Sequence, residues 1–333
     1  MIFMDKLKTA IVGCGSVSKM HFEAVVGNED IELVACCDIV PEKADKKAEK
    51  YGCKACYSFD EMLADVDFDV LHICTPHYLH APMAIDAMNK GKHVFCEKPL
   101  AVYYEDALRM CDCAKKNNVY LAVCFQNRYN MSSVYLKELV ESKKFGNIKA
   151  VKGNVTWDRD EEYYSDDWHG TLDKEGGGVI INQCIHTLDL IQWLVSSEVV
   201  SVDGSISQKR LKGKVETEDT ADALIRFKNG TEALFYGTLC YHANSAVFLE
   251  ILFENGKAVM YDDIVITDNN GNKELVELEK IKGKKNYWGS SHTVIINEFY
   301  DCVMNKKEFP VNCESGCAAV KIVDSLYKSA RNQ

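Results

Sequence analysis

The sequence has 333 residues, of which 47% are hydrophobic, and its formal net charge is −11. This length favours two domains, and the hydrophobic fraction is typical of globular proteins with full cores. The acidic balance argues against a nucleic-acid or anionic-membrane partner, because both select a basic surface.

The sequence contains fifteen cysteines, a high count for its length. Several lie within apolar runs such as LVACCD and LHICTP, which favours small buried thiols in a reducing cytoplasm over a disulfide framework. The N-terminal residues lead directly into an apolar strand without a secretory signal, and each apolar run is shorter than the ~18 residues of a membrane helix. We therefore expect a cytoplasmic protein without membrane contact.

Cysteines can also bind a metal ion, which is the alternative to a role as buried apolar side chains. Cys111 and Cys113 are two residues apart on a predicted helix, so their side chains face different directions. His77 and His80 have no cysteine or carboxylate at ligand spacing. We predict no metal site.

The first half of the chain alternates between apolar strands and helices. We predict strands at 8–15, 31–38, 69–76, 93–98 and 119–127, and helices at 16–28, 41–52, 57–65, 78–91 and 103–118. Pro41 suits the first turn of its helix, and Ser58 with Glu61 forms a capping box. This alternation predicts a doubly wound parallel sheet covered on both faces, an α/β Rossmann domain over residues 1–127.

The pattern changes over residues 128–333, where turns separate the strands. Asn229-Gly230 and Asn255-Gly256 lie between apolar-rich runs, a strong hairpin signal, and ITDNNGNKELVEL predicts a third hairpin. Helices are expected at 132–143, 180–195, 291–304 and 314–330. We predict a second α/β domain with a large open, mostly antiparallel sheet.

A glycine-rich loop, GCGSVS, follows the first strand. Gly13 permits a tight turn, Gly15 lets the backbone approach a pyrophosphate, and Ser18 replaces the third small residue of the dinucleotide-binding pattern. Asp38 ends the second strand, where a carboxylate binds the adenosine ribose hydroxyls. No basic residue follows it to bind a 2′-phosphate, so the sequence favours NAD over NADP. The alternative is a doubly wound domain that has lost its nucleotide.

Glu97 and Lys98 lie at the carboxyl end of a predicted strand, where such sheets bind their ligands. Pro99 disfavours a helical conformation at Lys98 and lets its ammonium group be directed. The alternative interpretation is a lysine that only contacts solvent.

The segment GGGVIINQCIH places Asn182 and His186 four residues apart at the start of a helix. In an α-helix from Val179, positions 182, 186, 189 and 193 form a polar line beside an apolar stripe, as the wall of a site would. The positive end of the helix dipole disfavours a charged imidazole, which suits a general base. The alternative is a hydrogen-bonded structural histidine.

Together the motifs GCGSVS, ICTPHYLH, GKHVFCEKPLA and GGGVIINQCIH resemble, in order and spacing, the glucose-fructose oxidoreductase / inositol dehydrogenase / rhizopine catabolism (Gfo/Idh/MocA) family over the whole chain. The resemblance implies that Lys98 hydrogen-bonds the reacting hydroxyl and that His186 is the general acid/base. It also implies a C-terminal domain that binds substrate and whose open sheet forms subunit contacts, hence a homodimer or homotetramer. Family members often have a cis Lys-Pro bond after this strand.

The resemblance further implies a set of cofactor contacts. They are Gly13, Gly15, Ser16, Val17, Asp38, Thr75, Pro76, His80, Glu97, Lys98 and Asn127.

Two positions depart from the family pattern. Many relatives have aspartate at Asn182, where asparagine keeps a hydrogen bond to a substrate hydroxyl but takes no proton. Several have Trp-Arg where this chain has Trp168 and His169, and Trp168 is expected near the nicotinamide. Arg128 is expected either to anchor substrate or cofactor or to form an ion pair at the domain junction. Tyr287 is expected to close over the site.

These features predict an NAD(P)-dependent oxidoreductase that acts on a secondary hydroxyl of a sugar, cyclitol or related polyol, with Lys98, His186 and Asn182 as its catalytic set. Two alternatives come from other classes. One is a glycosidase that uses tightly held NAD for transient oxidation, and the other is a non-catalytic sugar- or NAD-sensing regulator.

Overall fold

The computed structural model describes residues 6–261, 263–277 and 291–332. The chain divides into two compact units. The first contains Met1–Cys124 together with Ser291–Cys317, and the second contains Phe125–Ser290 and Ala318–Gln333. The segment 291–317, which the sequence analysis assigns to the C-terminal domain, is thus part of the first unit.

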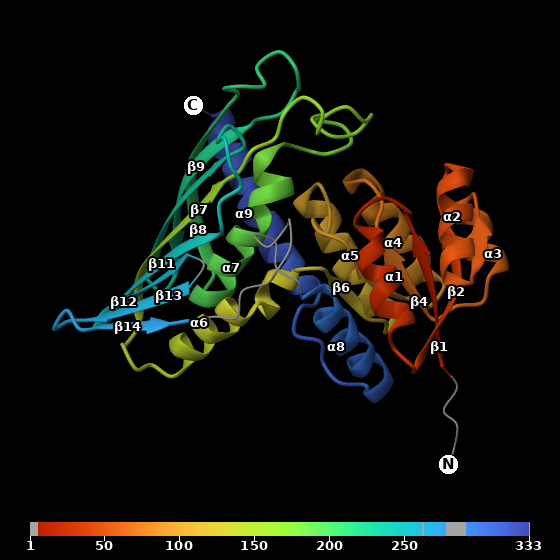
Figure 1. Cartoon of the computed structure of the whole chain (residues 1–333), viewed down its shortest axis with the longest axis horizontal. Coiled ribbons are helices and arrows are strands. Elements are labelled where there is room, and N and C mark those ends of the chain that lie inside the picture. Colours follow the sequence, from red (N-terminus) through yellow and green to blue (C-terminus); the bar gives the residue numbers. More distant parts are fainter. Residues whose placement is uncertain (1–5, 262, 278–290, 333) are drawn as a thin grey trace. The chain divides into compact units, whose positions relative to one another are not determined.

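The first unit is built on a six-stranded parallel sheet with strand order β3-β2-β1-β4-β5-β6, the Rossmann arrangement. Its helices flank the sheet (Figure 1). The strands are β1 (Leu7–Val12), β2 (Ile31–Cys37), β3 (Lys54–Cys56), β4 (Val70–Ile73), β5 (His93–Cys96) and β6 (Leu121–Val123). The helices are α1 (Ser18–Val26), α2 (Pro41–Tyr51), α3 (Phe59–Asp65), η1 (His77–Leu79), α4 (His80–Asn89), α5 (Tyr104–Asn117) and α8 (His292–Asn305).

Local sequence signals set the helix ends in this unit. Pro41 occupies the first turn of α2, which ends at Gly52 in the left-handed conformation with φ of 72°. Ser58 accepts a hydrogen bond from the backbone N–H of Glu61 and so begins α3 as predicted. Helix α8 packs against α1, although it lies far away in the sequence.

The second unit contains an eight-stranded sheet with strand order β14-β13-β12-β11-β7-β10-β9-β8. All neighbouring strands are antiparallel except β7 and β10. The three predicted hairpins are confirmed as β9–β10, β11–β12 and β13–β14. The strands are β7 (Ile148–Thr156), β8 (Val199–Ser207), β9 (Thr220–Phe227), β10 (Glu232–Thr238), β11 (Phe248–Phe253), β12 (Gly256–Tyr261), β13 (Asp263–Asp268) and β14 (Lys273–Val276).

Helices cover one face of this sheet, as Figure 1 shows for α7 and α9. Ile191 of α7 lies against Gly153 of β7, and Leu326 of α9 lies against Gly204 of β8. The helical elements that contribute residues to this unit are η2 (Gln126–Tyr129), α6 (Met131–Glu141), η3 (Ile180–Cys184), α7 (Ile185–Val195) and α9 (Cys313–Arg331). Burial alternates along β7 and β10, so the opposite face presents its side chains outward.

Within the described ranges, every helix is too short or too polar to span a lipid bilayer. All fifteen cysteines are free thiols, and most of them are buried.

Candidate active site

The glycine loop after β1 lies close to the loop that follows β4. Gly13 has φ of +89°, and a Cβ there would lie 2.4 Å from the carbonyl oxygen of Cys74, so only glycine fits. A Cβ on Gly15 would meet no described atom within 4 Å, which leaves open space above the loop. Ser18 is buried and its hydroxyl donates to the Gly15 carbonyl at 2.6 Å. Serine at the third position therefore closes the loop rather than weakening it.

The start of α1 is suited to an anion. Val17 precedes the helix without a capping side chain, the first turn has no acidic residue, and Ser16 is exposed. Such a terminus offers free backbone N–H groups to a phosphate. The open space above Gly15 and these donors fit a dinucleotide.

Asp38 lies at the end of β2 beside this loop, and both of its carboxylate oxygens accept backbone hydrogen bonds. Oδ2 accepts from Cys14 N at 2.8 Å and Oδ1 from Val40 N at 2.9 Å. The carboxylate is thus held at the edge of the glycine loop. Each oxygen keeps a second lone pair, which a ribose hydroxyl would use.

The loop after β4 contains Thr75 and Pro76, and His80 follows it in α4. The His80 ring is 0% exposed. Its Nδ1 lies 2.7 Å from the Pro99 carbonyl and its Nε2 lies 2.9 Å from the Thr75 carbonyl. Burial lowers the pKa of His80, while the two carbonyl acceptors favour the protonated ring. In this structure His80 joins the Thr75 loop to the Lys98-Pro99 turn.

Lys98 is half-buried where β5 ends, and the peptide bond to Pro99 is cis. Glu97, only 5% exposed, accepts the backbone N–H of Lys98 at Oε2 (3.2 Å) and faces His21 Nε2 at Oε1 (2.9 Å). Burial alone would raise the pKa of Glu97. The hydrogen bond from His21, with His292 and Lys98 nearby, outweighs burial and holds that pKa well below its usual range. A buried carboxylate therefore supports the turn that carries Lys98.

His21, Glu97 and Cys124 also have ligand-type atoms within 4.8 Å of one another, the spacing that a metal ion would need. Glu97 Oε1 and His21 Nε2 are already at hydrogen-bond distance. Burial raises the pKa of the Cys124 thiol well above its usual range, which disfavours the thiolate that a metal binds. We interpret this trio as a hydrogen-bonded cluster.

In the second unit, the glycine run before η3 allows a close approach of two backbone segments. A Cβ on Gly178 would lie 2.0 Å from the carbonyl oxygen of Glu218. The buried Glu218 carboxylate accepts from the backbone N–H groups of Gly178 and Ile180 and from the Tyr327 hydroxyl at 2.8 Å. It caps the helix start, so the positive helix end that we expected to act on His186 faces a carboxylate.

The helix that carries Asn182 differs from the prediction. Residues Ile180–Cys184 form a π-helical turn before the α-helix begins at Ile185. A π-helical turn closes at i, i+5 rather than i, i+4, so Asn182 precedes the regular α-helix that carries His186. Asn182 Nδ2 instead donates to Glu175 Oε1 at 2.5 Å, with Tyr163 Oη at 3.3 Å. π-Helical turns occur frequently at functional sites.

His186 is 9% exposed and its ring meets Phe125 edge-on at a centroid distance of 6.0 Å. Farther along α7, Asp189 forms a buried bidentate ion pair with Arg128, at 2.6 and 2.9 Å. The Arg128 guanidinium also lies 5.5 Å from the Trp193 ring. Of the two alternatives for Arg128, the structure contains an ion pair.

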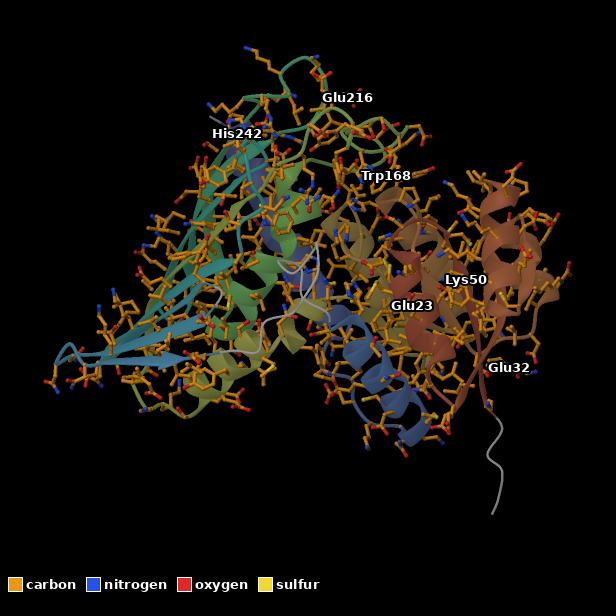
Figure 2. The ribbon with its side chains drawn as sticks, viewed as in Figure 1. Glu23, Glu32, Lys50, Trp168, Glu216 and His242 are labelled. Carbon is orange, nitrogen blue, oxygen red and sulfur yellow. The ribbon has the colours of Figure 1, made fainter. Side chains whose placement is uncertain are left out.

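Two further predicted residues, Asn127 in η2 and Trp168, lie outside the strands and α-helices. Asn127 is 5% exposed, and its Oδ1 has no hydrogen-bond partner in the part of the chain that the structure describes. Trp168 lies in the loop between β7 and η3 (Figure 2), with its ring 3.7 Å from that of His169. Tyr287 lies outside the described residues.

Sequence reasoning missed three buried residues that support the site: His21, Glu175 and Glu218. Glu175 immediately precedes the glycine run, which was an available signal. His21 lies one turn into the helix after the glycine loop, where the apolar pattern concealed it. Glu218 has no local signal, because it reaches Gly178 from the loop before β9, which is distant in the sequence.

The comparisons with known proteins agree with this fold. Residues 7–125 match the family model described as "Oxidoreductase family, NAD-binding Rossmann fold", and residues 134–259 match "GFO/IDH/MocA C-terminal domain". The chain is 29% identical to D-glucoside 3-dehydrogenase of Escherichia coli (strain K12), covering 97% of this chain and 95% of that protein. It is 27% identical to myo-inositol 2-dehydrogenase of Thermotoga maritima, covering 80% of each.

Among solved structures, the WlbA dehydrogenase from Bordetella pertussis in complex with NADH and UDP-GlcNAcA is similar at a TM-score of 0.85 and 30% identity. The match covers 98% of this chain and 97% of that one.

Proposed function

Because this chain belongs to the Gfo/Idh/MocA oxidoreductase family, we propose that it interconverts a secondary hydroxyl and a ketone on a sugar, cyclitol or related polyol. The observation that carries the proposal is the pairing of an open glycine loop at α1 with a half-buried Lys98 supported by Glu97. The first would hold a dinucleotide and the second would hold the reacting oxygen.

The cofactor would lie against Gly13, Gly15, Ser16 and Val17, with its ribose at Asp38. When bound, the nicotinamide supplies or accepts the hydride that the substrate carbon exchanges. The lack of a basic residue after Asp38 supports NAD over NADP. Thr75, Pro76, His80, Asn127 and Trp168 remain proposed cofactor contacts, with His80 acting through the turn that it holds.

Lys98 is proposed to donate a hydrogen bond to the substrate oxygen and stabilise the charge that develops on it. His186 is proposed to take the hydroxyl proton during oxidation and return it during reduction. Asn182, whose amide nitrogen donates to Glu175, is proposed to hold a neighbouring substrate hydroxyl. The second unit would therefore supply the acid/base group and the positioning of the substrate.

Replacement of Lys98 tests this proposal. Lys98→Ala should lower kcat by about 10² to 10⁴, the contribution of a positioned catalytic group, and leave the Kd for NAD nearly unchanged. Lys92→Ala is the matched control, since Lys92 lies just before the same strand and contacts the Phe68 ring. A polyol, sugar and sugar-nucleotide panel with NAD and NADP, followed at the reduced-nicotinamide absorbance, supplies the assay. Normal turnover by Lys98→Ala would refute the assignment.

The same panel separates the other classes of function. Cleavage of p-nitrophenyl glycosides without net change in cofactor redox state would indicate a glycosidase. Cofactor binding without turnover of any compound would indicate a sensor.

The outward face of the second unit's sheet supports self-association as a dimer or tetramer. Leu234, Tyr236, Leu252 and Tyr261 are exposed on it, and strand pairing brings them to one surface. Exposed apolar patches of this kind mark protein contacts. Tyr236→Lys should shift the protein to monomer in light-scattering measurements, whereas Tyr103→Lys, an exposed tyrosine of the first unit, should not. The free thiols support a reducing location, which we propose is the cytoplasm.

A further inference from the structure

A row of buried polar side chains runs through the core of the first unit and ends at Glu97. We call it the buried chain; its members, in order, are Thr9, Tyr300, His72, His21 and Glu97. Thr9 Oγ1 lies 2.7 Å from Tyr300 Oη, and Tyr300 Oη lies 2.8 Å from His72 Nε2. His72 Nδ1 lies 2.8 Å from His21 Nδ1, and His21 Nε2 lies 2.9 Å from Glu97 Oε1. All four separations are hydrogen-bond distances.

The fold brings these side chains together from separate elements. Ile11 of β1 pairs with His72 of β4, and Thr9 is two residues before Ile11, so Thr9 and His72 face the same side of the sheet. Helices α1 and α8 pack together and contribute His21 and Tyr300. The first four members are 0% exposed, so water does not compete for their hydrogen bonds.

The carboxylate sets the direction of the buried chain, because an ionised Glu97 can only accept. His21 must therefore carry a proton on Nε2, and Nδ1 of its uncharged ring accepts from His72 Nδ1. His72 Nε2 then accepts from the Tyr300 hydroxyl, whose oxygen accepts from Thr9. Burial lowers the pKa of His72 well below its usual range, in agreement with an uncharged ring.

The opposite direction requires a charged His21 ring. His72 would then donate through Nε2, and Tyr300 would donate to Thr9. That arrangement places a cation in direct contact with a second histidine inside a dry core, where an additional charge is costly. The arrangement directed toward Glu97 satisfies the same contacts with both rings uncharged.

We propose that the donors of the buried chain all point toward Glu97, and that this makes His21, His72 and Tyr300 positioning residues for Lys98. Glu97 Oε1 is held by His21, and Glu97 Oε2 accepts the backbone N–H of Lys98. The carboxylate thus joins the Lys98 backbone to the core, and the donors behind it fix its orientation. The functional part of this inference rests on the proposed role of Lys98.

The buried chain does not serve as a proton path to solvent. Its far end, Thr9, is 0% exposed, and a threonine hydroxyl does not titrate in water. A role in positioning is therefore the one that its geometry supports.

Tautomer measurement tests the direction without any activity assay. In protein labelled with ¹⁵N-histidine, we expect His21 to carry its proton on Nε2 and His72 on Nδ1. Signals are assigned by their loss in His21→Gln and His72→Gln. A His72 proton on Nε2, or protons on both nitrogens of His21, would overturn the proposed direction. A metal ion on His21 Nε2, detected by elemental analysis and by loss of that N–H signal, would overturn it as well.

The positioning role has its own test in Tyr300→Phe, which removes one hydroxyl and keeps the ring. We expect His72 to keep its proton on Nδ1, the ¹⁵N shift of Nε2 to change because that nitrogen loses its donor, and kcat to fall about fivefold, the effect of one neutral hydrogen bond. KM and the Kd for NAD should stay nearly unchanged. Tyr120→Phe is the matched control, because Tyr120 also contacts Phe299 but lies outside the buried chain.

The two tests fail in different ways. Predicted tautomers with equal kcat in Tyr300→Phe and Tyr120→Phe would overturn the positioning role alone. If no compound is turned over by the native protein, the proposed function fails, and the tautomers still decide the direction of the buried chain.

Discussion

Two buried carboxylates, one in each unit, support the residues proposed for catalysis, but their electrostatics differ. Glu97 in the first unit faces His21 and lies near His292 and Lys98, and these groups lower its pKa despite burial. In the second unit burial raises the pKa of Glu218, although backbone N–H groups and the Tyr327 hydroxyl partly oppose it. Basic partners outweigh burial at the first carboxylate, while neutral donors do not at the second.

This difference predicts opposite responses of the two units to acid. A carboxylate with a lowered pKa stabilises the fold above its unfolded pKa, and that contribution is lost as pH falls. A carboxylate with a raised pKa binds its proton more tightly when folded, so its unit loses stability as pH rises through that range. Mild acid should therefore weaken the first unit before the second.

The largest effect is expected at another buried carboxylate of the second unit, Asp189. Burial raises its pKa and Arg128 opposes this, so the pair depends on both partners. Asp189→Asn leaves a buried guanidinium without its counter-ion and should lower the free energy of unfolding by about 3–5 kcal/mol. Asp203→Asn, which breaks an exposed pair with Arg226, should cost under about 1 kcal/mol in the same urea titration. If the two variants lost the same free energy of unfolding, burial would not be what makes the Asp189–Arg128 pair important.

An intermediate effect is expected from His292 in the first unit. Burial lowers the pKa of His292 from 6.5 to about 4. Between these values the unfolded chain binds the proton more tightly, so stability falls as pH drops from 6.5 to about 4, by about 3 kcal/mol in total. Hydrogen exchange at pH 7.5 and 5, corrected for intrinsic rates, should show protection lost first in the first unit. Uniform loss across both units would refute the comparison.

A smaller effect separates the two carboxylates directly. Glu97→Gln should lower the free energy of unfolding by roughly 2 kcal/mol, because it removes an acceptor whose ionised form its partners favour. Glu218→Gln should lower it by about 1 kcal/mol or less, because burial already disfavours the ionised form of Glu218. Both are measured as free energies of unfolding at pH 7.5. A larger loss of stability in Glu218→Gln than in Glu97→Gln would contradict the difference that we infer between the two carboxylates.

Local signals predicted most of the fold. Pro41, Ser58 and the Asn-Gly turns act over a few residues, so their structures follow from the sequence alone. The π-helical turn at 180–184 was not predictable in this way, because its apolar spacing also suits an α-helix. The return of α8 to the first unit was also missed, since helical periodicity does not identify the sheet that a helix covers.

The candidate site divides in the same manner. The glycine loop, Asp38 and Lys98 were identified because each lies at the end of a predicted strand. Glu218 and the His72–Tyr300 contact join residues far apart in the chain, so no local pattern contains them.

The membership of α8 in the first unit has a consequence for how the protein is made. The nucleotide-binding half is interrupted in the sequence by most of the second unit, and Tyr300 completes its core only near the end of the chain. During synthesis the ribosome must therefore release almost the whole polypeptide before that half can close around its last buried ring. A fragment ending near residue 127 would lack this helix and should remain incompletely folded, however complete its six strands are.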